Sequence, residues 1–146
     1  MNNKINIIYW SVTGNTELMA QSIYEGSSKN ENVRLISVDK ANIDDVKEAD
    51  ILFLGCPSMG NEVLEETEME PFMESISNDI KGKKIVLFGS YGWGDGEWMQ
   101  DWEERIRKYG GELVEDSNIS NETQSSEEIA HLSSLGEKYS CALQNN

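Results

Sequence analysis

The residues best suited to ligand binding lie in three short segments, and the first of them is rich in hydroxyl groups. It reads Ser11-Val12-Thr13-Gly14-Asn15-Thr16. Where such a segment opens a helix, its hydroxyls and the free backbone N–H groups of the first turn form an anion site. The segment contains no Lys or Arg, so a bound phosphate would depend on N–H groups, hydroxyls and the helix dipole. Simple helix capping would explain one hydroxyl and would leave the other two without a role.

The second segment combines a turn with a thioether and reads Pro57-Ser58-Met59-Gly60-Asn61-Glu62. Gly60-Asn61 is a strong turn dipeptide because both residues tolerate positive φ angles. Met59 would stand at the tip of this turn, where the sequence offers no buried face for it. A thioether packs well against an aromatic ring, so the segment predicts a contact with a flat ligand.

The third segment reads Ser90-Tyr91-Gly92-Trp93-Gly94-Asp95-Gly96. Its alternate glycines allow the backbone to approach a ligand closely, and they put Trp93 in a loop. Trp93 either stacks on a flat ligand or covers the edge of a sheet. Trp98 and Trp102, in contrast, follow a helical spacing that is typical of a core.

Four apolar runs rich in β-branched residues predict the strands that precede these segments. They span residues 5–10, 33–38, 51–56 and 85–89. Continuous apolar runs, rather than strict alternation, are typical of a parallel sheet that is covered on both faces. A fifth, weaker strand is expected within residues 112–119.

Helical stripes lie between these runs. Their apolar residues recur at spacings of three and four, as in a helix with one buried face. The last stripe is preceded by Ser125 and Glu128, which fit a capping box. The stripes are Met19, Ala20, Ile23 and Tyr24; Met69, Phe72, Met73, Ile76 and Ile80; Trp98, Trp102, Ile106 and Tyr109; and Ile129, Leu132, Gly136, Tyr139 and Leu143.

The alternation of strands and helices predicts an α/β fold, namely a doubly wound five-stranded parallel sheet with helices on both faces. Ligands of such sheets bind beyond the carboxyl ends of the strands. All three segments follow predicted strands directly, so we expect them to meet at one edge of the sheet. The sequence shows no repeat and no linker, and we expect residues 1–146 to form a single domain.

Composition excludes several classes of protein. The chain carries 27 acidic and 12 basic residues and a net charge of −15, whereas nucleic-acid binding requires clustered Lys and Arg. No apolar stretch approaches the roughly 18 residues of a membrane span. No signal peptide is recognisable, and we therefore expect a cytoplasmic protein. Cys56 and Cys141 lack metal-ligand spacing and accompany a single histidine, His131, so we expect free thiols and no metal site.

The acidic residues bunch after Met59 and after Gly94. This bunching predicts that an added negative charge beside the ligand is repelled, and that partner proteins of opposite charge dock here. The two groups are Glu62, Glu65, Glu66, Glu68 and Glu70, and Asp95, Glu97, Asp101, Glu103 and Glu104.

The three segments, in this order, resemble those of short-chain, clostridial-type flavodoxins. The likeness runs through most of residues 5–109 and is weaker after Gly111. It implies a flavodoxin-like FMN-binding domain that carries single electrons at low potential through non-covalently bound FMN, as a monomer without catalytic residues. It also implies redox partner proteins of the ferredoxin-dependent type with basic docking faces. The stretches that resemble the family are Tyr9-Trp10-Ser11-Val12-Thr13-Gly14-Asn15-Thr16, Gly55-Cys56-Pro57-Ser58-Met59-Gly60-Asn61-Glu62 and Ser90-Tyr91-Gly92-Trp93-Gly94-Asp95-Gly96.

The same resemblance implies a role for individual residues. Met59 would cover the inner face of the flavin ring, and Trp93 would stack on its outer face. Glu62 would accept a hydrogen bond from the ring, and the Gly92 backbone would donate one. The phosphate would be held by the side chains of Ser11, Thr13, Asn15, Thr16 and Ser90 and by the backbone of Val12 and Gly14.

The complete FMN site that the resemblance implies also includes neighbours of these residues. Two of them depart from the family pattern: Pro57 stands where the pattern has a hydroxyl residue, and Asn61 replaces an acidic residue beside the ring. The further members are Pro57, Ser58, Gly60, Asn61, Tyr91 and Gly94.

Other nucleotide and phosphate chemistries lack their motifs in this chain. G-x-G-x-x-G and G-x-x-x-x-G-K-[ST] are both absent. Cys56 is followed six positions later by Glu62 rather than by the arginine of a low-molecular-weight phosphatase, and no acidic residues end the first strand as in a response regulator. Two alternatives stay open, a flavin-dependent enzyme or activator such as a ribonucleotide-reductase helper, and a scaffold of the same fold without cofactor.

Overall fold

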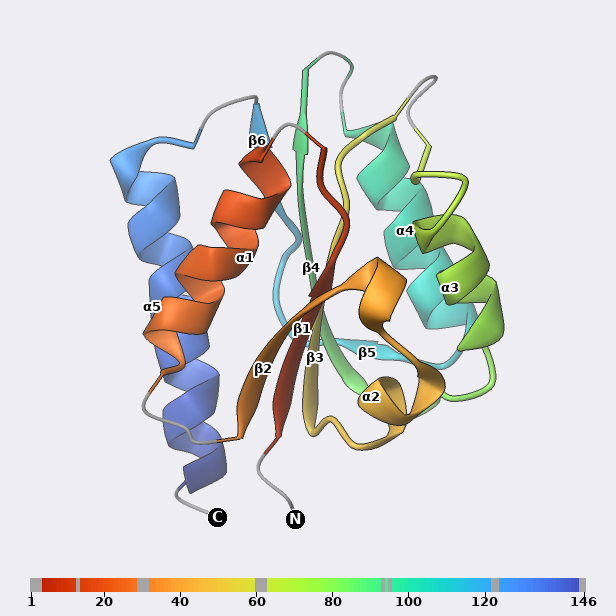
Figure 1. The fold of residues 1–146 in the computed structure, drawn as a ribbon, viewed down its shortest axis with the longest axis horizontal. Coiled ribbons are helices and arrows are strands. Elements are labelled where there is room, and N and C mark those ends of the chain that lie inside the picture. The colour runs from red at the N-terminus through yellow and green to blue at the C-terminus, as the bar shows by residue number, and fades with distance from the viewer. Residues whose placement is uncertain are drawn as a thin grey trace.

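A parallel β-sheet forms the middle layer of the molecule (Figure 1). The computed structural model describes residues 4–12, 14–28, 32–59, 63–92, 94, 96–121 and 124–144. The strand order is β2-β1-β3-β4-β5, with β6 also paired to β4, and all of these pairings are parallel. The strands are β1 (Ile5–Tyr9), β2 (Val33–Ser37), β3 (Ile51–Gly55), β4 (Lys84–Tyr91), β5 (Glu112–Leu113) and β6 (Asn118–Asn121).

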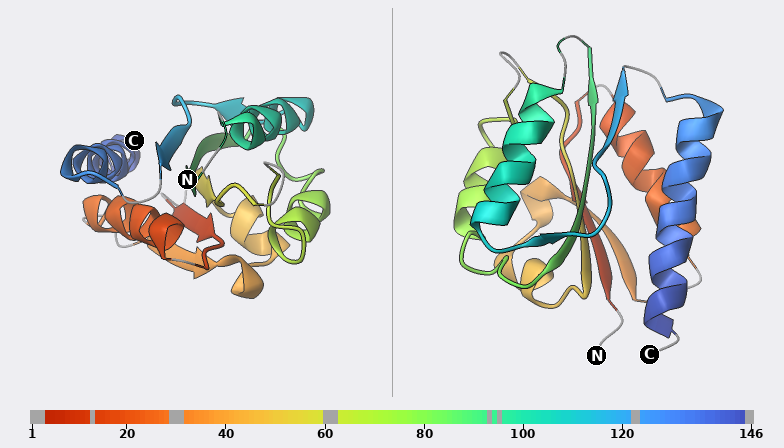
Figure 2. Two further views of the ribbon diagram at one scale, coloured as in Figure 1. Left: turned by 90° about the horizontal axis from the view of Figure 1, so that it is seen from above. Right: turned by 180° about the vertical axis from the view of Figure 1, so that it is seen from behind.

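Helices cover both faces of this sheet (Figures 1 and 2), which confirms the predicted fold class. One face is covered by α1 (Asn15–Gly26) and α5 (Ser126–Gln144). The other face is covered by α2 (Ile43–Lys47), α3 (Met69–Ser75) and α4 (Glu97–Lys108), and a 3-10 turn spans Val38–Lys40.

The central strands are buried on both sides. In β1, Ile7 packs in the core under α1 and α5, whereas Ile8 belongs to the core of the opposite face. Their register partners in β3, Phe53 and Leu54, divide in the same way, and all four side chains are fully buried. This double burial explains why the strands appear in the sequence as continuous apolar runs.

Two helices differ from the sequence-based expectation. The stripe that begins at Met69 was expected to continue to Ile80, but α3 ends at Ser75. Ile76 and Ile80 are nevertheless fully buried, because the turns after the helix keep them against the sheet. Helix α2 was not predicted, since five residues are too few to show a helical period.

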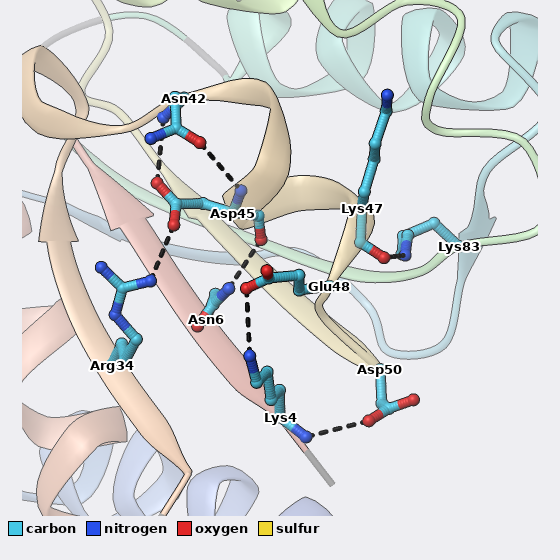
Figure 3. Close-up of polar contacts among 9 residues, drawn as sticks. All are labelled: Lys4, Asn6, Arg34, Asn42, Asp45, Lys47, Glu48, Asp50 and Lys83. Atoms are coloured by element: carbon cyan, nitrogen blue, oxygen red, sulfur yellow. Dashed lines mark hydrogen bonds and ion pairs between the residues drawn. The ribbon is translucent and has the colours of Figure 1, made fainter. Parts of the chain in front are cut away.

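Helix α2 is held in place by polar contacts at the end of the sheet opposite the three segments (Figure 3). Asn42 and Asp45 form a capping box, and the Asp45 carboxylate also pairs with Arg34 at 2.7 Å. The buried Asn6 amide donates to the Asp45 carbonyl at 2.6 Å. At the other end of α2, the Lys83 ammonium donates to backbone carbonyls, including that of Ala49 at 2.8 Å. These residues therefore fasten α2 to β1 and β2.

The fifth strand was predicted as one element and is interrupted in the structure. Ile85 and Phe88 are three positions apart on β4, whereas their partners Leu113 and Asn118 are five positions apart. The two extra residues form a bulge between β5 and β6. Its Glu115 pairs with Lys138 of α5 at 2.6 Å, and Ser117 donates to Glu103 of α4 at 2.7 Å. The bulge therefore connects helices from both faces across the sheet edge.

Several smaller expectations can be compared directly. Trp98 and Trp102 are each 1% exposed, as predicted for core residues. Ser125 and Glu128 exchange both hydrogen bonds of the predicted capping box. Cys56 and Cys141 are free thiols. None of the helices within the described ranges is long and apolar enough to cross a membrane.

Candidate functional site

The three segments meet at the carboxyl ends of β1, β3 and β4, drawn at the top of Figure 1. A cavity of about 220 Å³ opens between them. It is lined by Val12 and Asn15 from the first segment, Pro57, Ser58 and Met59 from the second, and Ser90, Tyr91 and Gly92 from the third. The sequence-predicted residues that line this cavity therefore come from all three segments.

The first segment leads into α1 through Gly14, whose backbone conformation only a residue without Cβ adopts readily. Gly14 has a φ of 97°, and a Cβ built there would meet nothing within 4 Å. Its N–H donates to Ser11 Oγ at 3.2 Å. No side chain within the described residues caps the start of the helix. The N–H groups of the first turn are therefore available to an anion.

A pair of buried hydroxyls lies at the inner side of this candidate anion site. Thr16 Oγ1 lies 2.9 Å from Ser90 Oγ, and the two residues are 0% and 4% exposed. The Ser90 carbonyl accepts a hydrogen bond from Ser58 N–H at 2.9 Å. Ser90 therefore joins the first and the second segment at the end of β4.

Met59, in the second segment, and Val63, just after it, form an isolated antiparallel bridge, the Met59–Val63 hairpin. Met59 N–H donates to Val63 O at 2.9 Å, and Val63 N–H donates to Met59 O at 3.0 Å. Met59 is partly exposed and lines the cavity. Thr13, Gly60, Asn61, Glu62 and Trp93 lie outside the described residues.

In the third segment, the backbone at Gly92 faces open space, whereas the Tyr91 side chain packs against the core. A Cβ at Gly92 would meet nothing within 4 Å, so the backbone faces open space. Tyr91 also packs against the core, where its ring lies 5.6 Å from that of Trp98. Gly94 has a φ of 90°, a conformation that side-chain-bearing residues rarely adopt.

Two site-supporting residues were missed by sequence reasoning. Glu65 was interpreted as a surface acid, but it is 5% exposed and accepts the backbone N–H groups of Thr67, Glu68 and Met69. Burial raises its pKa, but these bonds and that from the Thr67 hydroxyl outweigh burial and leave the pKa lowered. Trp10 was placed at the end of a strand and in the first stretch that resembles the family, without a role of its own. Its indole N–H donates to Glu68 Oε1 at 3.0 Å. Nothing in their spacing distinguishes Glu65 and Glu68 from the neighbouring acids.

The acidic groups are therefore less uniform than the sequence indicates. In addition to Glu65 and Glu68, Glu70 is engaged, since it forms a two-point ion pair with Arg105 whose Nη1–Oε1 distance is 2.7 Å. Within the described part of the chain, the exposed acids that make no polar contact in this region are Glu66, Asp101 and Glu104.

The donor set fits the phosphate and the ring of a flavin nucleotide. An uncapped helix start could supply N–H groups to a phosphate without a cation, and the Thr16–Ser90 pair has one hydroxyl hydrogen left to donate. Met59 and Gly92 line space for a flat group. Among the described residues no cluster of His, Cys, Asp and Glu could hold a metal ion.

Comparisons with known proteins agree with this geometry. The flavodoxin family model matches residues 7–134. The chain is 56% identical over 112 residues to the flavodoxin of Clostridium beijerinckii, which covers 76% of this chain and 81% of that protein. It is 44% identical over 111 residues to the flavodoxin of Megasphaera elsdenii, with coverages of 75% and 81%.

Solved structures resemble the chain over a still larger part of its length. The solution structure of two-electron reduced Megasphaera elsdenii flavodoxin has a TM-score of 0.83 and 40% identity, and covers 92% of this chain and 98% of that one. An archaeal flavodoxin has a TM-score of 0.85 and 28% identity, with coverages of 97% and 99%. The chain therefore belongs to the flavodoxin family, whose members bind FMN and carry electrons rather than catalyse a reaction of their own.

Proposed function

We propose that this chain binds FMN across the three segments, with the phosphate at the start of α1. The observation that carries this proposal is the buried Thr16–Ser90 hydroxyl pair beside an uncapped helix N-terminus. Ser11, Thr13 and Asn15 add further groups to the same anion site, together with the Val12 and Gly14 backbone. Hydrogen bonds to a charged phosphate are about twice as strong as neutral ones, which compensates for the absence of a cation.

The flavin ring then lies between the second and third segments. Met59 faces one side of it and Trp93 the other, while Glu62 and the Gly92 backbone bond its edge. Pro57, Ser58, Gly60, Asn61, Tyr91 and Gly94 shape the surrounding loops. FMN supplies the redox chemistry when bound, and the protein's residues orient it and exclude water from its faces.

The charges around this edge support low-potential electron transfer. A carboxylate about 10 Å away in water repels an added electron by roughly 0.4 kcal/mol. Glu66, Asp101 and Glu104 together would contribute about 1 kcal/mol before salt screening. Lys4, Lys47 and Lys83 lie around α2 and the starts of β1 and β4, at the end of the sheet opposite this edge (Figures 1 and 3).

The partners that fit this edge are redox proteins of the ferredoxin-dependent type with basic docking faces. Electron transfer to such a partner should slow as ionic strength rises. Asp101→Asn with Glu104→Gln should reduce the salt dependence. Glu25→Gln, at the far end of α1, should leave the salt dependence unchanged. A rate that is insensitive to salt in the unmodified protein would contradict this docking mode.

Residues 1–146 would act as one FMN-binding domain, as a monomer in the cytoplasm. The match of the family model over residues 7–134 and the close packing of α5 on α1 support a single domain. Two free cysteines, of which Cys56 is buried, suit a reducing compartment.

A spectrum of the purified protein tests the proposed function. We expect a yellow protein whose flavin is released by acid and is FMN. Apoprotein should melt at a higher temperature when FMN is added, because FMN at a hundred times its Kd stabilises the folded form by about 2.7 kcal/mol. Apoprotein that neither takes up FMN nor changes its melting temperature would exclude this function.

A further inference from the structure

Three contacts connect the three segments or the residues that flank them. The first and third segments are joined by Thr16 and Ser90 at 2.9 Å, and the second and third by Ser58 N–H and Ser90 O, also at 2.9 Å. The Trp10 indole, directly before the first segment, donates to the Glu68 carboxylate, six residues after the second segment, at 3.0 Å. This last contact connects the side of the site that holds phosphate with the side that holds the ring.

Trp10 lies directly before Ser11, where the phosphate segment begins. Its backbone N–H still bonds to Gly55 O at 3.0 Å, so the residue extends the pairing of β1 with β3. Its ring is partly buried against the core beneath α3 and α4. The indole position is therefore set by the sheet and by core packing.

Glu68, the acceptor of the indole hydrogen bond, is held in place by hydrogen bonds of its own backbone. Its own backbone N–H donates to Glu65 Oε1 at 2.6 Å, and its carbonyl accepts Phe72 N–H at 3.1 Å. Glu65 N–H in turn lies 3.5 Å from Cys56 Sγ at the end of β3. The stretch that follows the Met59–Val63 hairpin is thereby held at both the sheet and the start of α3.

We propose that Trp10 and Glu68 are positioning residues, whose hydrogen bond sets the spacing between the phosphate segment and the Met59 hairpin. The proposal rests on the proposed function, since that spacing matters only for a ligand that spans both segments. FMN spans both segments through its phosphate and its ring. Riboflavin lacks the phosphate and engages the ring side alone, so its binding depends far less on the spacing.

The test is a set of titrations of apoprotein with FMN and with riboflavin. Trp10→Phe removes the indole donor and keeps a ring in the core, and Glu68→Leu removes the acceptor. Each variant should bind FMN about tenfold more weakly, equivalent to about 1.4 kcal/mol, while riboflavin binding changes less than twofold. The double variant should lose no more than either single variant, because both remove one contact.

Two control variants test whether the loss of FMN affinity comes from the removed charge rather than from the lost hydrogen bond. Glu68→Gln keeps an oxygen acceptor and should lose less than threefold in FMN affinity. Glu66→Gln removes the charge of an exposed neighbour and should bind as the unmodified protein does. Urea unfolding of each apoprotein identifies any variant whose loss comes from instability.

Three outcomes would overturn the inference. They are an unchanged FMN affinity in Trp10→Phe and Glu68→Leu, additive losses in the double variant, and equal losses for FMN and riboflavin. If the unmodified protein itself fails to bind FMN, the proposed function is wrong, so the two failures are distinguishable.

Discussion

Helices α1 and α4 begin in the same way, yet only one of them begins at the cavity. Each follows a strand and a glycine with positive φ, 97° at Gly14 and 86° at Gly96. Neither has a side-chain cap within the described residues, and each has one glutamate in its first turn. Backbone geometry and helix dipole are therefore alike at the two starts.

The surroundings of the two starts differ. A Cβ at Gly14 would meet open space, whereas one at Gly96 would lie 3.1 Å from the Ile119 side chain of β6. The start of α1 faces Ser90 through Thr16, and its residues line the cavity. We therefore expect an anion at the start of α1, where a neighbouring strand supplies a hydroxyl and leaves room, and not at the start of α4.

The largest expected effect is on the buried face of α4. Trp102 is 1% exposed, so Trp102→Ala should cost about 3–5 kcal/mol of unfolding free energy, as large truncations in a core do. Gln100→Ala, on the exposed face of the same helix, should change it by less than about 0.5 kcal/mol. Urea unfolding of the apoproteins measures both, and a cost below about 1 kcal/mol for Trp102→Ala would mean that α4 is not anchored by its core face.

Alanine substitutions at Gly14 and Gly96 test whether the two helix starts differ in anion binding. Gly14→Ala and Gly96→Ala should each cost about 1–2 kcal/mol, because a Cβ disfavours positive φ. Only Gly14→Ala should also weaken FMN binding, since only that backbone faces the proposed phosphate. Calorimetric titration with FMN checks this, and equal affinity losses in both variants would remove the distinction between the two helix starts.

The smallest expected effect concerns Glu65, whose pKa is lowered because hydrogen bonds from Thr67, Met69 and Glu68 outweigh its burial. Its carboxylate therefore stabilises the fold at neutral pH, and that contribution is lost as pH falls through the lowered pKa. Glu65→Gln should be less stable than the unmodified protein near pH 7, and the difference should shrink below the usual glutamate range. Melting temperatures from pH 7 to pH 3 check this, with a pH-independent difference as the contrary result.

Sequence patterns predicted the parts of the fold that depend on local periodicity. The strands β1, β3 and β4 are continuous apolar runs, and the Trp98–Trp102 spacing identified a buried helix face. The interruption of the fifth strand could not be predicted, because Glu115 and Ser117 find their partners on helices that only the fold brings near. Helix α2 escaped notice because its stabilising contacts, such as Asn6 to Asp45, join residues far apart in sequence.

The candidate site likewise has residues that the sequence predicted and residues that it could not predict. The segments carrying Ser11 and Ser90 stood out because hydroxyl and glycine patterns have a direct meaning at strand ends. Glu65 and Glu66 are adjacent and chemically identical, yet one is buried under a helix start and the other is exposed. No local pattern separates them, since the difference arises from which backbone N–H groups the chain turns toward each carboxylate.

The central claim is that the start of α1 and Ser90 form the phosphate site. The most direct measurement is the affinity of Thr16→Val and Ser90→Ala for FMN and for riboflavin. Loss of hydrogen bonds to a charged group predicts about a tenfold to hundredfold weaker FMN binding and nearly unchanged riboflavin binding. Equal losses for the two ligands would show that the phosphate binds elsewhere.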